Sequence, residues 1–166
     1  MTFDEFKTLA KGLKSAYTTP NFLPDEYSIK VWFKFLEDLP CDLATLAVQK
    51  YIATNKYPPT IADIRETVAN MMVGSPDWSE SWKQVMKLIS LYGLPNEAKA
   101  YEAMDDTTRE AVKRLGWKNL CMSQNQTADR ANYRMVYEAV IKDQKASLSL
   151  PDNLKMKLSN IKLIGE

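Results

Sequence analysis

The sequence contains no histidine and only two cysteines among its 166 residues. The lack of histidine excludes imidazole acid–base catalysis, histidine metal ligands and a histidine pH switch. Cys41 and Cys121 lie 80 positions apart without a Cys-x-x-Cys motif, so they predict free thiols in a reducing compartment rather than a zinc site. Cys121 stands between Leu120 and Met122, which favours a buried structural thiol over a nucleophile.

Glycine and long apolar runs are also scarce. None of the five glycines belongs to a GxxxxGK[ST] or GxGxxG motif, which argues against a P-loop or a dinucleotide-binding turn. No apolar run is long enough to span a bilayer, and the acidic start of the sequence does not resemble an export signal. We therefore expect a cytoplasmic protein that makes no contact with the membrane.

The charges are nearly balanced, with 22 Lys and Arg against 21 Asp and Glu. This balance excludes nucleic-acid binding by bulk charge, although a local basic patch remains compatible with it. The acidic pairs Asp4-Glu5, Asp25-Glu26 and Asp105-Asp106 fall at predicted helix starts, where they complement the helix dipole. We expect a protein that is not an enzyme, without catalytic residues, metal site or cofactor.

Apolar residues recur at three- and four-residue spacing, and no run alternates with period two, so the sequence predicts an all-α fold. Thr2 and Glu5 form a capping-box pattern, and Asp42 and Thr60 are further predicted caps. The predicted helices cover residues 2–17, 24–39, 42–51, 60–71, 78–92, 96–104, 106–115, 117–122 and 128–145. Trp32, Trp78 and Trp82 lie on apolar stripes and are predicted core residues, with Trp32 and Trp82 largely buried.

Three regions follow from breaks in this pattern. A small helical N-terminal domain over residues 1–73 ends at a Gly-Ser-Pro break, and a second helical region covers 77–146. Residues 147–166 form an amphipathic tail in which Pro151 can start a helix. Three arrangements are open for this tail: it docks on its own core, it remains mobile, or it lays its apolar face into the groove of a partner.

Two sets of residues are candidates for binding a partner. The first is the tail, in which four apolar residues share one helix face beside basic residues: Leu150, Leu154, Leu158 and Ile161, with Lys155 and Lys157. The second is the helix over 128–145, where Arg130 and Arg134 flank Tyr133. Arginines beside aromatic rings are typical of single-strand nucleic-acid binding, whereas a packed core with a solvated face is the simpler interpretation.

A distinctive stretch within residues 3–72 is Tyr57-Pro58-Pro59-Thr60-Ile61-Ala62-Asp63-Ile64. Residues 3–72, and this stretch most specifically, resemble a family of small phage proteins that load and inhibit replicative helicases in Gram-positive bacteria. Residues 77–141 look like the second half of longer relatives, through residues 116–121 and 128–133. We interpret the two prolines themselves as a rigid turn between helices.

The resemblance implies an adaptor that binds a hexameric replicative helicase, restrains it and helps to deliver it to an origin complex containing an initiator protein. It also implies a small helical N-terminal domain and a flexible C-terminal segment that contacts the helicase. Two other functions stay open. One is a DNA-binding replication or regulatory protein that uses Arg130, Arg134, Lys142 and Lys145, with weak DNA contact; the other is a phage inhibitor of a host protein.

Overall fold

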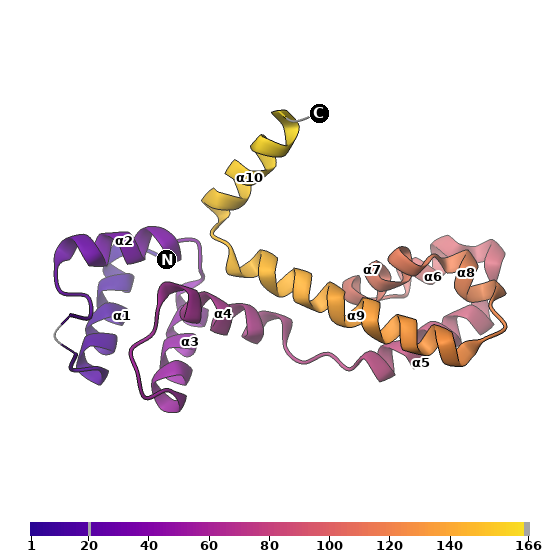
Figure 1. The fold of residues 1–166 in the computed structure, drawn as a ribbon, viewed down its shortest axis with the longest axis horizontal. Helices are drawn as coiled ribbons and strands as arrows, with labels where there is room; N and C mark the ends of the chain where they lie inside the picture. The colour runs from indigo at the N-terminus through magenta and orange to yellow at the C-terminus, as the bar shows by residue number, and fades with distance from the viewer. Residues whose placement is uncertain (20, 165–166) are drawn as a thin grey trace. The chain divides into compact units, whose positions relative to one another are not determined.

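The computed structural model describes residues 1–19 and 21–164, and this part of the chain is built from helices alone (Figure 1). The predicted all-α fold is therefore confirmed. The helices are α1 (Phe3–Ala16), α2 (Glu26–Leu36), α3 (Cys41–Thr54), α4 (Ile61–Val73), α5 (Trp78–Tyr92), the short 3-10 turn η1 (Leu94–Asn96), α6 (Glu97–Glu102), α7 (Asp106–Leu115), α8 (Trp117–Met122), α9 (Gln126–Ser149) and α10 (Asp152–Ile164). Among the described residues, no helix combines the length and the apolar character that a membrane span requires.

The chain divides into two compact units. The first unit combines Met1–Gly74 with Lys145–Glu166, and the second is Ser75–Gln144. Helix α9 begins in the second unit and ends in the first, so the segment before α10 belongs to the same unit as α1–α4.

The core of the first unit lies between α1, α3 and α4, with α2 packed against α1 and α4. Phe6, Leu13, Ile64 and Val68 are each at most 1% exposed there. The spacing of these residues on α1 and α4 places them on one face of each helix, which is why the two helices turn that face to the core.

Local sequence signals determine where these helices begin. The predicted capping box between Thr2 and Glu5 is present at α1, and Thr60 forms a second one with Asp63 at α4. Two predicted starts are wrong by one or two residues. Helix α2 begins at Glu26, because the Asp25 carboxylate accepts a hydrogen bond from the Ser28 N–H and so takes the N-cap position. Helix α3 begins at Cys41, before Asp42, with no side-chain cap.

The second unit has its own core between α5, α7 and α9. Val85, Val112 and Tyr133 are fully buried there, and Trp117 is 1% exposed. Trp117 comes from the six-residue helix α8, which follows Gly116 at a φ of +87°, and its indole N–H donates to the Gly93 carbonyl at 3.1 Å. The sequence predicted this short helix but not that its tryptophan would be the largest of the deeply buried side chains.

The other tryptophans differ in burial. Trp82 is 8% exposed, which confirms its prediction. Trp32 and Trp78 are partly buried and pack against the cores of their units, so Trp32 is less buried than Trp82. Trp32 and Phe22 pack edge to face, and Trp32 lines an open hollow of about 490 Å³ that also borders Pro59 and Ile61. One side of Trp32 therefore packs on the core and another borders this hollow.

A chain of hydrogen bonds crosses the core of the second unit. The Ser81 hydroxyl lies 2.5 Å from the Tyr133 hydroxyl and 2.6 Å from that of Thr108, and the Thr108 hydroxyl donates to the Asp105 carboxylate at 2.5 Å. Each buried hydroxyl thus has a partner, so the chain is a structural network. Burial raises the pKa of Tyr133 to about 12, more than its hydrogen bonds to Ser81 and Thr108 lower it.

Candidate partner-binding helix and its anchor

Helix α10 carries most of the residues that the sequence predicted as a partner-binding site. Leu150, two residues before the helix, is 39% exposed, and Leu158 within the helix is 49% exposed. Leu154 and Lys155 are partly buried and Lys157 is exposed. Ile161 belongs to α10, but its side chain lies outside the described residues. From Met156 to Asn160 every described residue is exposed, so α10 is covered only in its first turn.

The predicted apolar stripe is covered only in part, since Leu154 is partly buried and Leu158 is 49% exposed. A hollow of about 210 Å³ separates the start of α10 from α2, and from α10 it is lined by Asp152, Asn153 and Met156. A helix advances about 100° per residue, so Met156 lies about 200° around the axis from both Leu154 and Leu158. The two leucines therefore lie on the side of the helix away from the residues that line this hollow.

The contact between α10 and α2 is incompletely packed. In the described part of the chain, the buried Oδ1 atom of Asn153 has no hydrogen-bond partner. Lys34 and Glu37 of the α2 side line the same hollow, so the interface is polar as well as open. Close packing along its length does not hold α10 to α2, and another interaction must fix where the helix starts.

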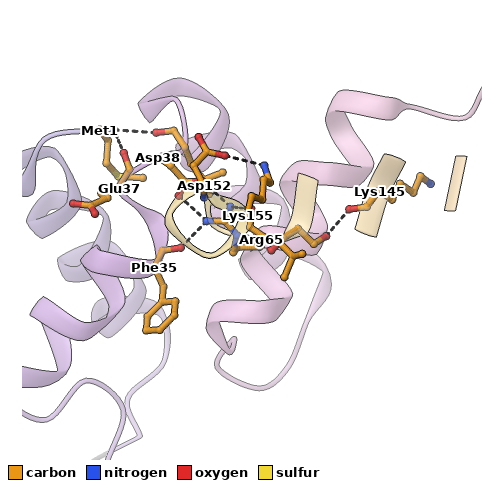
Figure 2. Close-up of polar contacts among 11 residues, drawn as sticks. Met1, Phe35, Glu37, Asp38, Arg65, Lys145, Asp152 and Lys155 are labelled. Carbon is orange, nitrogen blue, oxygen red and sulfur yellow. Dashed lines mark hydrogen bonds and ion pairs between the residues drawn. The ribbon is translucent and has the colours of Figure 1, made fainter. Parts of the chain in front are cut away.

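That interaction is made by Arg65 of α4, whose side chain is 2% exposed. Its Nη1 and Nη2 atoms donate to the two carboxylate oxygens of Asp38 at 2.8 and 2.7 Å, as Figure 2 shows. The remaining bonds of the guanidinium go to backbone carbonyls: Nη1 donates to Phe35 at 2.6 Å, Nε to Ser149 at 2.7 Å and Nη2 to Leu150 at 2.9 Å. The buried charge thus has both an ionic partner and satisfied donors.

Asp38 completes the anchor from the other side. Its Oδ2 atom accepts a hydrogen bond from the Asp152 N–H at 3.3 Å, at the first residue of α10 (Figure 2). Burial raises the pKa of the Asp38 carboxyl, but the hydrogen bonds and charge of Arg65, together with the bond from Asp152, outweigh that effect and leave it below its usual value. Asp38 therefore stays ionised at neutral pH.

Pro151 explains why the chain has a break at this point. Proline disfavours helical conformation in the residue before it and has no N–H of its own, so α9 ends at Ser149. The last carbonyls of α9 then lack partners within the helix, and Arg65 binds that of Ser149 together with that of Leu150, the residue after the helix. The Pro151 side chain is buried, and its carbonyl accepts from the Leu154 and Lys155 N–H groups to begin α10.

The two candidate arginines of the second unit lie together. Arg130 and Arg134 are exposed, and each guanidinium is 5.3 Å from the centre of the Trp78 ring. Arg134 also pairs with Glu138 at 2.8 Å. Tyr133, between them in sequence, points inward and is fully buried, so it is part of the core and not of a binding face.

The Arg65–Asp38 anchor was not predicted, although the sequence pattern marks one of its two residues. Arg65 falls on the apolar stripe of α4, next to Ile64 and three residues before Val68, and an arginine at such a position requires a buried partner. Asp38 lies in the turn between α2 and α3, where no pattern marks it. Within the described residues, acidic and cysteine side chains form no cluster of three or more that could hold a metal ion.

Comparison with known proteins identifies only the N-terminal part of the chain. Residues 1–65 match the family model for the N-terminal domain of gp39, the helicase loader and inhibitor of phage SPP1, which confirms the resemblance to the phage loader and inhibitor family. The match includes both Asp38 and Arg65, whereas the residues 149–152 that they bind lie outside it. Neither a curated protein nor a solved structure gives a significant match.

Proposed function

We propose that this protein is a phage replication adaptor, because its residues 1–65 match the family model of the gp39 N-terminal domain. It binds the hexameric replicative helicase of the phage or its host, restrains it and helps to load it at the origin, where an origin-binding initiator is the second partner. The protein acts by binding rather than by catalysis, and the ATP-driven reaction belongs to the helicase.

The single observation that carries the helicase contact is the incompletely covered apolar side of α10. Leu158 is half exposed, and the partly buried Leu154 lies on the same side, opposite the residues that line the hollow beside α2. Exposed leucines on one helix side are unfavourable in water unless a partner covers them. Docking an amphipathic helix into an apolar groove is a common mode of such recognition.

The charge of α10 indicates the chemistry of that groove. Between Asp152 and Ile164 the sequence contains three lysines and one acid. Lys155 is tied to Asp152 at 2.8 Å, whereas Lys157 is exposed. The complementary partner surface is an apolar groove with an acidic rim.

The experiment is to mix the full chain with the purified helicase, with and without ATP, and to measure complex formation and the rates of ATP hydrolysis and unwinding. We expect a complex and a lowered rate in at least one nucleotide state, and no ATP hydrolysis by the chain alone. Unchanged rates and no complex with either the phage or the host helicase would exclude this function.

A DNA-binding role is the second candidate, and the arrangement of Arg130 and Arg134 over Trp78 favours it. Two exposed guanidiniums beside one ring can bind a phosphate while a base stacks nearby. Affinity for single-stranded DNA that falls steeply with salt, and that is lost in Arg130→Ala/Arg134→Ala, would support this role. A third candidate, inhibition of another host protein, uses the same type of contact and would appear as binding without any effect on a helicase.

A further inference from the structure

The Arg65–Asp38 pair lies where three helix ends meet. Phe35 is in the last turn of α2 and Ser149 is the last residue of α9, so the arginine binds carbonyls at two helix C-termini. Asp152 is the first residue of α10, so the aspartate binds an N–H at a helix N-terminus. Helix C-termini carry partial negative charge and N-termini partial positive charge, so each member of the pair faces a helix end of opposite charge.

The pair holds residues 149–152 through their backbone. The carbonyls of Ser149 and Leu150 accept from Arg65, and the N–H of Asp152 donates to Asp38. Pro151 between them is buried, whereas the Leu150 side chain is left 39% exposed. The contact thus fixes the path of the chain and leaves the apolar side chains available.

From this geometry we infer that the Arg65–Asp38 pair is a clamp that holds α10 in the position from which it binds its partner. Arg65 is a positioning residue, which does not itself touch the partner. The clamp itself is a contact within the protein, whereas its role in binding rests on the proposed helicase contact. A helix of 13 residues is marginal in water by itself, so fixing its first turn lowers the ordering cost that binding would otherwise carry.

Two substitutions release the clamp from opposite sides. Arg65→Lys keeps a charge for Asp38 but removes the planar fork, so the bonds to residues 149 and 150 are lost. Pro151→Asp leaves Arg65 and Asp38 intact and places a carboxylate beside Asp38, because both residues line the same hollow. Asp is also a good N-cap residue, so this second variant does not weaken α10 as a helix.

The first readout is hydrogen exchange of the full-length protein. We expect both variants to speed exchange of the amides of residues 152–160 about tenfold, while the amides of Ala44, Ala47 and Val48 in α3 stay protected. Arg114→Lys is the matched control, since Arg114 pairs with Glu110 and Asp143 on the surface of the other unit. If Arg65→Lys also speeds exchange of the α3 amides, that variant destabilises the unit as a whole. The exchange of Pro151→Asp alone then tests the clamp. Unchanged exchange over 152–160 in a folded variant overturns the clamp.

The second readout is affinity for the helicase. If only a fraction of the molecules hold α10 in position, the apparent dissociation constant rises in proportion, so we expect an increase of about tenfold in both variants and none in Arg114→Lys. Faster exchange with unchanged affinity would overturn the positioning role and leave the clamp as a structural contact. If the unmodified protein binds no helicase, the proposed function fails while the exchange result still judges the clamp.

Discussion

Arg65 and Asp38 form a doubly hydrogen-bonded ion pair, with N···O distances of 2.8 and 2.7 Å, inside the first unit. Asp38 is 15% and Arg65 2% exposed at the side chain, so neither charge is well solvated. A buried charge is stable only with a partner, and the pair therefore constrains every residue that it contacts. It connects the matched family domain to the backbone at the start of α10.

Removal of one member of the pair is expected to be costly. Arg65→Met leaves Asp38 ionised and without its partner, which should lower the free energy of unfolding by about 3–5 kcal/mol. Thermal and urea denaturation measure this loss. The double variant Arg65→Met/Asp38→Leu should recover most of the loss, because no unpaired charge remains; an equal or greater loss would show that the arginine acts through its carbonyl contacts alone.

The same ion pair predicts that the first unit loses stability in acid. The folded pKa of Asp38 is lowered, so its stabilising contribution is complete above the unfolded-state value of about 4 and is lost as pH falls through the lower folded value. Denaturation measured between about pH 5 and pH 2 should show this loss. The Asp38→Asn variant should be less stable at neutral pH, and its free energy of unfolding should change less with pH in this window. The same change with pH as in the unmodified protein would contradict the assignment of the acid sensitivity to Asp38.

Tyr133 predicts the opposite behaviour at high pH in the second unit. Its folded pKa of about 12 lies above the ordinary tyrosine value of 10.0, so stability is complete below pH 10 and is lost as pH rises toward 12. Unfolding of this unit, followed by tryptophan fluorescence, should therefore begin in that range. Tyr133→Phe should lower stability at neutral pH, because Ser81 loses a partner, and should weaken the alkaline transition. A transition identical to that of the unmodified protein would assign it to other tyrosines.

The stability cost of replacing a tryptophan by alanine should follow how deeply its side chain is buried. Trp117→Ala should lower the free energy of unfolding by about 3–5 kcal/mol, the range for a fully buried aromatic side chain. Trp32→Ala should cost clearly less, because Trp32 is only partly buried. Chemical denaturation of both variants measures the two losses, and an equal or larger loss for Trp32→Ala would contradict the deeper burial of Trp117.

The sequence predicts features that depend on neighbours in the chain. Capping at Thr2 and Thr60, and the break at Pro151, are local, so the helices they bound were predicted to within a few residues. Arg65 has partners 27 and 84 positions away, and no periodicity reveals such a distance. Trp117 was not predicted as core for another reason: a helix of six residues is too short to show an apolar stripe.

The candidate site was predicted in outline only. The apolar spacing of Leu154 and Leu158 is visible in the sequence, but the side of α10 that borders the hollow beside α2 is not. That side carries Asp152, Asn153 and Met156, a mixed set without an apolar pattern. Which side of an amphipathic helix is free depends on where its first turn is held, and that is a property of the tertiary structure.

The most direct test of the account is the affinity of the full-length Leu154→Asp/Leu158→Asp variant for the hexameric replicative helicase. Leu91→Asp is the matched control, because Leu91 is an exposed leucine in the other unit, at 65% exposure. Burying a leucine contributes about 1.5–3 kcal/mol, so losing two should weaken binding by at least about tenfold even after ordering costs. Binding as tight as that of the unmodified protein, in a variant whose circular dichroism and melting temperature are unchanged, would contradict the assignment of α10 as the helicase contact.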